Sequence, residues 1–167
     1  AAINVGLLAV IDVTIKTSPQ ILGTKSTPNQ FAHNTWLSDD GNTVFTTDEK
    51  PGAYVAAYDI TSFSNITEVD KFRTLPGTGV IPHNVHVKGD FLVTSYYTRG
   101  AQILDAEYPD LLVEVGYYDT SPLYSSTGYH GAWGAYPFLP SGVVLITDIE
   151  EGLYTLGFDN KKASRLK

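Results

Sequence analysis

The sequence predicts an all-β protein, a β-propeller segment of about three and a half four-stranded antiparallel blades. A pattern of short strands and glycine turns recurs along the chain, the composition favours strands and turns, and no apolar pattern with the 3.6-residue helical period is sustained. An irregular β-sandwich is the rival interpretation, because strands with turns every ~8–12 residues suit that fold too.

The clearest copy of the repeat runs from His83 to Asp105 and reads as three short strands joined by turns at Gly89 and Gly100. Matching glycines lie at positions 41 and 142 and at positions 52 and 152, so the first glycines are 48 and 53 residues apart and the second are 48 and 52 apart. A period near 50 residues is typical of propellers, in which a single unit cannot bury its apolar faces alone.

Composition narrows the class of protein. With 167 residues the chain can form one domain with a core, and its 11 Tyr, 7 Phe, 15 Gly and 9 Pro favour strands and turns. The net charge of −7 argues against nucleic acid as a partner. There is no Cys for a disulfide or a thiolate, and no apolar run approaches the ~20 residues of a membrane-spanning segment.

Each unit is expected to contain four strands, A to D. The chain begins with strands C and D of a first unit, continues through two complete units and ends with strands A to C of a last one. We therefore divide one partial propeller domain, residues 1–167, into units of approximately 1–30 (half), 31–80, 81–128 and 129–167. An aspartate closes each of the first three C strands, and we interpret these residues as Asx-turn acceptors: Asp12, Asp59 and Asp105.

An open arc of blades would leave strand edges unpaired and apolar faces exposed, whereas propellers usually close with 4–8 blades. We therefore expect the chain to belong to a longer propeller or to be completed by other subunits. In isolation it should be oligomeric.

Alternating strand direction predicts that one rim near the propeller axis collects the residues that open the A strands and close the B strands. In this alignment Trp36 and Trp133 each follow a His by three residues and share one repeat position, which His86 fills in the middle unit. The candidate ligand-binding residues of this rim are His33, Trp36, Asp48, Glu49, His83, His86, Tyr96, Tyr97, Arg99, His130, Trp133, Asp148 and Glu150.

Three interpretations of this rim stay open. The His residues can tie their loops to neighbouring blades, or the rim can bind a glycan or peptide on its aromatic rings. It can also hold a divalent metal, since imidazole suits Zn, Cu or Fe and carboxylates suit Ca or Mn. No closely spaced motif such as H-E-x-x-H supports the metal. The metal candidates are His33, His83, His130, Asp48 and Glu49.

No residue is predicted to be catalytic. The sequence has no G-x-S-x-G elbow and no Cys. A carboxylate pair from Asp48, Glu49, Asp148 and Glu150 could serve glycoside hydrolysis, but nothing in their spacing selects it. The enzyme alternative is a metal-dependent hydrolase or lyase that uses the His and carboxylate rim.

Several segments together resemble a known family. Gly131-Ala132-Trp133 is followed by Tyr136 to Gly142 and by Thr147 to Leu153, and His33 to Trp36 combines with Thr47-Asp48-Glu49. Over about residues 30–156 the chain resembles the C-terminal part of the choice-of-anchor B proteins, which are secreted bacterial proteins built from LVIVD repeats. The first 24 residues resemble a generic LVIVD unit.

The resemblance implies a β-propeller, export from the cell and attachment through a variable C-terminal anchor, but no established activity. The chain is shorter than the family's usual span and no anchor follows Lys167, so it resembles an excised C-terminal portion. We predict a secreted or cell-surface bacterial module that binds or scaffolds a protein or glycan ligand.

Overall fold

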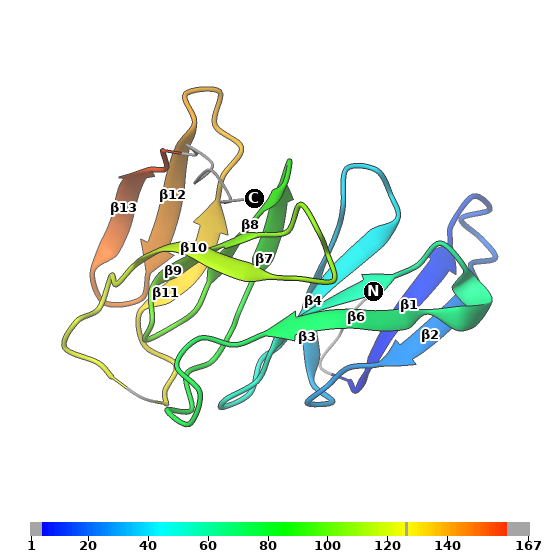
Figure 1. Cartoon of the computed structure of the whole chain (residues 1–167), viewed down its shortest axis with the longest axis horizontal. Helices are drawn as coiled ribbons and strands as arrows, with labels where there is room; N and C mark the ends of the chain where they lie inside the picture. The colour runs from blue at the N-terminus through cyan, green and yellow to red at the C-terminus, as the bar shows by residue number, and fades with distance from the viewer. Residues whose placement is uncertain (1–4, 126, 160–167) are drawn as a thin grey trace, which may run out of the picture.

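The computed structural model describes residues 5–125 and 127–159, and these residues form thirteen β-strands and one short 3₁₀ turn. The strands make four antiparallel sheets, each built from consecutive strands. Figure 1 shows the sheets in a row that follows the chain, from β1 and β2 on the right to β11–β13 on the left. The all-β class and the antiparallel four-stranded sheets are confirmed.

The strand bounds are as follows. The first sheet contains β1 (Leu7–Asp12) and β2 (Gln20–Ser26). The second contains β3 (Ala32–Leu37), β4 (Thr43–Asp48), β5 (Val55–Asp59) and β6 (Thr67–Phe72), with the 3₁₀ turn η1 (Phe63–Asn65) before β6. The third contains β7 (Val85–Lys88), β8 (Phe91–Ser95), β9 (Ala101–Asp105) and β10 (Val113–Tyr118). The fourth contains β11 (Ala132–Tyr136), β12 (Val143–Asp148) and β13 (Gly152–Gly157).

These sheets follow the expected strand order, with A strands at β3, β7 and β11. The end of the last predicted unit, residues 160–167, lies outside the described residues. No helix of the described residues is long and apolar enough to span a membrane.

Apolar cores lie between successive sheets. Neighbouring residues of one strand point to opposite faces, so Val44 of β4 packs toward β1 whereas Phe45 packs toward the third sheet. In the third sheet, Leu92 and Val93 divide in the same way between two cores. A two-sheet sandwich has one core, whereas here three cores alternate with four sheets, as stacked blades require.

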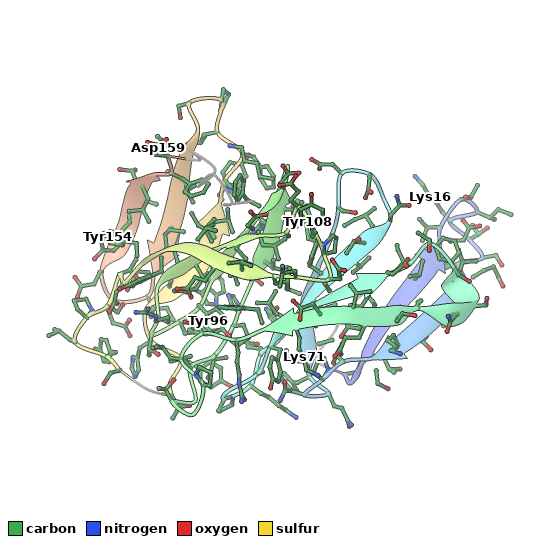
Figure 2. The ribbon with its side chains drawn as sticks, viewed as in Figure 1. Lys16, Lys71, Tyr96, Tyr108, Tyr154 and Asp159 are labelled. Carbon is green, nitrogen blue, oxygen red and sulfur yellow. The ribbon has the colours of Figure 1, made fainter. Side chains whose placement is uncertain are left out.

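The core between the two four-stranded sheets contains the fully buried ring of Tyr96, which Figure 2 labels. The Tyr96 hydroxyl donates to the carbonyl of Ala53 in the preceding unit, at 3.2 Å. Burial raises the pKa of this phenol. Tyr96 is therefore part of the contact between sheets and not an exposed platform for a ligand.

The predicted Asx-turns are confirmed. The carboxylates of Asp12, Asp59 and Asp105 each accept a hydrogen bond from the backbone N–H two residues later, at 2.8 to 3.0 Å. These residues fix the turns that follow β1, β5 and β9, so they belong to the scaffold.

Hydroxyl groups on the second strand of two units connect consecutive sheets. The Thr47 hydroxyl donates to the carbonyl of His83, and the Ser95 hydroxyl donates to the carbonyl of Trp133, at 3.1 Å for the second pair. Thr47 and Ser95 occupy equivalent positions at the ends of β4 and β8. The repeat thus positions the backbone of each inner strand relative to the preceding sheet.

Candidate functional site

In the second and fourth sheets the first strand contains a β-bulge, whose extra residue has its side chain at the rim. In the second sheet, Ala32 pairs with Asp48 and Asn34 with Thr47, so His33 is the extra residue of a β-bulge. His83 lies just before β7, and its backbone N–H donates to the carbonyl of Ser95 at 2.9 Å. Both imidazoles therefore emerge at the same end of their strands.

These two imidazoles meet the carboxylate of Glu49. His33 Nδ1 lies 3.0 Å from Glu49 Oε2, and His83 Nε2 lies 3.7 Å from Glu49 Oε1. The two rings stack with centroids 4.6 Å apart. Exposure falls from 27% for the His33 side chain to 14% for Glu49 and 3% for His83, so the cluster is reached from its His33 edge.

Hydrogen bonding fixes the tautomer of neutral His83. Its Nδ1 donates to the carbonyl of Trp133, which leaves Nε2 without a proton and directed toward Glu49. Burial lowers the pKa of His83, and the Trp133 carbonyl opposes that shift. The ring is thus held neutral with a lone pair facing the cluster.

Tyr97 holds Glu49 from the other side. Its buried phenol donates to Glu49 Oε1 at 2.5 Å, and burial followed by this hydrogen bond raises the pKa of the phenol. Tyr97 has φ of 37°, in the left-handed region that a bulky residue rarely adopts. Two 3.0 Å backbone hydrogen bonds with Ala132 keep it there. Strain of this kind, retained by surrounding contacts, gathers at functional sites.

The predicted equivalence of Trp133 with Trp36 is wrong by three residues. In the last sheet Ala132 pairs with Asp148 and Gly134 with Thr147, so Trp133 is the extra residue of the bulge, as His33 is in the second sheet. Trp133 accordingly stacks on His83, with centroids 5.5 Å apart. We name His33, His83 and Trp133 the bulge ladder.

The position of Trp36 is instead repeated by His86 and Tyr136, each three residues after a member of the bulge ladder. The Trp36 ring lies 4.7 Å from His86 and stacks on Phe138 at 5.4 Å. Phe138 also makes edge contacts with His86 and Tyr136. This second tier of rings packs between the inner strands, so Trp36 contributes to the contact between units.

Asp48 and Asp148 do not line the cluster. Asp48 is fully buried and accepts hydrogen bonds from the Thr27 hydroxyl at 2.6 Å and from the backbone N–H groups of Asn29 and Phe31. It anchors the loop that leads into β3. With its carboxylate directed into that loop, Asp48 is not one of the residues that meet at His33.

Asp148 has the same role in the last unit. It accepts from the Ser121 hydroxyl at 2.5 Å and from the backbone N–H groups of Glu150 and Glu151 at 3.0 Å. Burial by itself raises the pKa of this carboxyl, but these hydrogen bonds outweigh it and the pKa is lowered. Asp148 is therefore a charged loop anchor.

His130 and Glu150 form a separate pair. His130 Nδ1 lies 2.6 Å from Glu150 Oε1, the His130 ring stacks on Tyr124, and Glu150 Oε2 accepts from the backbone N–H of Gly131. These contacts lower the pKa of Glu150, chiefly through the hydrogen bond with His130. Gly131 and Ala132 separate His130 from the bulge ladder, so the expectation that His130 matches His33 fails.

The remaining candidate, Arg99, lies on the outer side of the third sheet. Its guanidinium carbon is 3.8 Å from the ring centroid of Tyr117 in β10, which is a cation–π contact. Arg99 thus joins the B-to-C loop to the outermost strand of its own sheet.

Two features of the site escaped the sequence interpretation. Tyr129, an exposed ring, contacts Tyr97 edge-on at 5.2 Å, and no repeated pattern marks it. The bulge ladder could have been found by spacing, because His33 and Trp133 each precede the matching Thr47 and Thr147 by 14 residues. An alignment of the histidines by residue type misplaces the last unit by three residues.

The cluster can bind a cation or polar ligand. In the described part of the chain, His33, Glu49 and His83 form a group in which one potential ligand atom from each lies within 4.8 Å of the others. Trp133, which is 55% exposed, extends the cluster with an apolar surface. Metal ligation and ring stacking are the two kinds of chemistry that the site offers.

Four sheets fanned in sequence with a ladder of inner-strand residues define a β-propeller-like fold, and comparison with solved structures agrees. The chain is similar to a candidate 6-phosphogluconolactonase from Bacteroides fragilis (TM-score 0.65, 15% identity, 85% of this chain and 41% of that chain). It is also similar to the Cps50 (Swd1) β-propeller domain from Myceliophteria thermophila (TM-score 0.64, 11% identity, 91% and 44%).

A third similar structure is the periplasmic gluconolactonase PpgL from Pseudomonas aeruginosa (TM-score 0.53, 14% identity, 93% of this chain and 60% of that chain). No family model and no curated protein matches the sequence. The chain therefore spans between 41% and 60% of the propellers it resembles, and at these identities the likeness shows the fold alone.

Proposed function

We propose that the chain is part of a larger secreted or cell-surface bacterial β-propeller, of the choice-of-anchor B type with LVIVD repeats, that binds a glycan at the rim carrying the bulge ladder. The observation that carries the binding role is the indole of Trp133. It is 55% exposed although its inner neighbour in the ladder, His83, is buried. Exposed aromatic rings beside a few oriented polar groups are typical of ligand sites.

The polar groups on the same rim as Trp133 suit sugar hydroxyls. Glu49 offers acceptor oxygens, and His33 adds a ring nitrogen at the exposed edge of the cluster. The net charge of −7 disfavours acidic polysaccharides, which would be repelled. We therefore favour a neutral oligosaccharide over an acidic one.

Intrinsic fluorescence tests this proposal, because the chain has only two Trp residues. In the Trp36→Phe variant, Trp133 is the single reporter. Titration with neutral chito-, cello- and manno-oligosaccharides should shift its emission saturably. The single variant Trp133→Ala should lose oligosaccharide binding, as measured by calorimetry. The control variant Tyr136→Ala, which changes a ring on the same strand but in the other ring tier, should retain binding.

Other results would redirect or overturn the proposal. A response to a cationic peptide with none to the sugars would assign a peptide partner and contradict the glycan. Binding that survives Trp133→Ala would place the ligand elsewhere on the molecule and refute a role for this rim.

A hydrolase is the second candidate, favoured by the meeting of His33, Glu49 and His83. Two of the similar structures carry gluconolactonase names, which makes a sugar lactone the substrate to test. Acid release from gluconolactone, followed with a pH indicator with and without Zn²⁺, should exceed the spontaneous rate for wild type and not for Glu49→Gln. A wild-type rate equal to the spontaneous rate would exclude this activity, and equal rates of both proteins above it would exclude a role for Glu49.

A further inference from the structure

We propose that His33, Glu49 and His83 form a binding site for a divalent transition-metal ion of the Zn²⁺ class. The site lies at the rim used by the proposed function but does not rest on it, because the metal alone is the probe. Failure of metal binding and failure of glycan binding are separate observations.

The donor set selects the class of metal. Two imidazoles and one carboxylate are a ligand set of zinc and of other first-row divalent ions, whereas Ca²⁺ and Mg²⁺ prefer oxygen ligands alone. The sequence has no Cys and no Met, so the soft ligands that favour Cu(I) are missing. We commit to Zn²⁺ as the ion to test.

The spacing of the donors suits one small ion. Metal–ligand bonds of about 2.0–2.2 Å in tetrahedral geometry separate neighbouring ligand atoms by about 3.4 Å. His33 Nδ1 lies 3.0 Å from Glu49 Oε2, and His83 Nε2 lies 3.7 Å from Glu49 Oε1. One ligand atom of each of the three residues lies within 4.8 Å of the others, so a bound ion would draw the donors together by at most about 1.4 Å.

The groups behind the donors already hold them as a metal site requires. The Trp133 carbonyl accepts from His83 Nδ1, which directs the unprotonated Nε2 into the cluster. The Tyr97 hydroxyl donates to Glu49 Oε1 at 2.5 Å. A ring N–H bound to a backbone carbonyl and a hydrogen-bonded ligand carboxylate are the outer contacts that orient metal ligands.

The three side chains differ in solvent exposure, and this leaves one side of a bound ion open to a further ligand. His83 is buried, Glu49 is partly buried and His33 is the most exposed of the three. An ion bound there would have protein ligands on its inner side and would take water or a ligand atom on the side of the exposed edge. Three protein ligands with one open position are the arrangement of zinc sites that bind exchangeable ligands.

Equilibrium dialysis tests the site. The full chain is stripped with a chelator, dialysed against Zn²⁺ and analysed for metal content, and the affinity is measured by calorimetry. One Zn²⁺ per chain is expected. His33→Ala and Glu49→Gln should each weaken binding by more than tenfold, and Tyr97→Phe should weaken it by about 10–100-fold through the orientation of Glu49.

The His130 and Glu150 pair supplies the matched control, because it also joins an imidazole to a carboxylate but has no third potential ligand grouped with it among the described residues. His130→Ala and Glu150→Gln should leave Zn²⁺ stoichiometry and affinity unchanged. Circular dichroism and thermal unfolding identify any variant that fails to fold. Glu49→Gln keeps an acceptor for Tyr97 and so preserves a folded test.

Three results would overturn the site. Wild-type chain that stays free of Zn²⁺ in dialysis refutes it, as does Zn²⁺ binding that persists in folded Glu49→Gln. Stronger binding of Ca²⁺ than of Zn²⁺ would contradict the role of the imidazoles. Visible absorption of the Co²⁺ form provides an independent check, since His33→Ala should change its spectrum.

Discussion

The imidazole of His83 stacks on the indole of Trp133 in the next sheet, and its Nδ1 also donates to the carbonyl of that residue. Both residues occupy the same place in the repeat, one position before the residue that pairs with Ser95 or Thr147. The repeat therefore brings chemically different side chains to the same position around the axis. One end of this ladder carries the His33 and Glu49 pair, and the other presents an exposed ring.

Removing the Tyr97 hydroxyl should loosen this arrangement. Tyr97→Phe deletes the donor to Glu49 and leaves a half-buried carboxylate with one hydrogen bond fewer. Hydrogen bonds to charged groups contribute about 1.5–3 kcal/mol, and we expect the lower end because water can reach Glu49. Urea unfolding measures the loss. Tyr129→Phe, on the exposed neighbouring ring, should change the free energy of unfolding by less than about 0.5 kcal/mol.

The second ring tier should make stability depend on pH through His86. Burial lowers the pKa of His86, and its buried Nδ1 has no hydrogen-bond partner in the part of the chain that the structure describes. The unfolded chain, with a His pKa near ~6.5, therefore binds a proton more readily than the folded chain. Stability should fall as pH decreases below ~6.5, by at most about 1.4 kcal/mol per pH unit for this group.

Chemical unfolding at several pH values between 5 and 8 measures that slope. In His86→Leu, the slope below pH ~6.5 should be smaller than in wild type by up to one proton. His83 has a lowered pKa as well, so some slope should remain in the variant. Equal slopes in both proteins would show that His86 titrates alike in the folded and unfolded chains.

The anchor Asp48 offers a test of loop attachment. Its two carboxylate oxygens accept from the Thr27 hydroxyl and from the backbone of Asn29 and Phe31. Asp48→Asn keeps the shape but turns one acceptor into an N–H donor that would face other donors. A loss of roughly 2–4 kcal/mol in unfolding free energy is expected, since leaving buried groups unpaired costs about 1–3 kcal/mol each. Asp39→Asn, in an exposed turn, is the control and should be nearly neutral.

Much of the fold could be predicted from the sequence because the repeat marks where each strand begins and ends. Glycines with positive φ recur at the predicted turns, including Gly41, Gly89 and Gly142, and apolar residues on both faces of β4 and β8 required a sheet on each side. These are local signals repeated at a constant distance. Such signals survive even when individual residues differ between units.

The site was predicted only in part, because its contacts join different units. His33, Glu49, His83 and Tyr97 were all candidates, but the sequence could not show that Asp48 turns into a loop while the adjacent Glu49 turns to the rim. Successive residues at the end of a strand point to opposite sides, and the bulge at His33 decides which side is which. A bulge leaves no residue-type signature, and the error at Trp133 has the same cause.

Alanine substitutions at two glycines with nearly equal φ distinguish the cost of backbone strain from the cost of steric contact. Gly100 and Gly142 have φ of 76° and 77°, yet a Cβ at Gly100 would lie 2.0 Å from the Tyr118 carbonyl oxygen and a Cβ at Gly142 would meet nothing within 4 Å. Gly142→Ala should cost about 1–2 kcal/mol for the left-handed conformation alone. Gly100→Ala should cost clearly more, or prevent folding. Thermal unfolding compares them, and equal losses would contradict a close approach between Gly100 and β10.

The apolar faces of the two end sheets should drive association of the isolated 167-residue chain. Leu153 in β13 is 62% exposed, in a sheet that packs on a partner sheet through one face only among residues 5–125 and 127–159. Burial of a Leu side chain contributes about 1.5–3 kcal/mol, so Leu153→Lys should weaken association by roughly tenfold or more. Leu123→Lys, at an exposed position in the loop between β10 and β11, adds the same charge and should leave association unchanged. Sedimentation across a range of concentrations measures the effect. A wild-type chain that stays monomeric at high concentration would show that the exposed face of β13 needs no cover, and a face of that kind would not continue into a further blade.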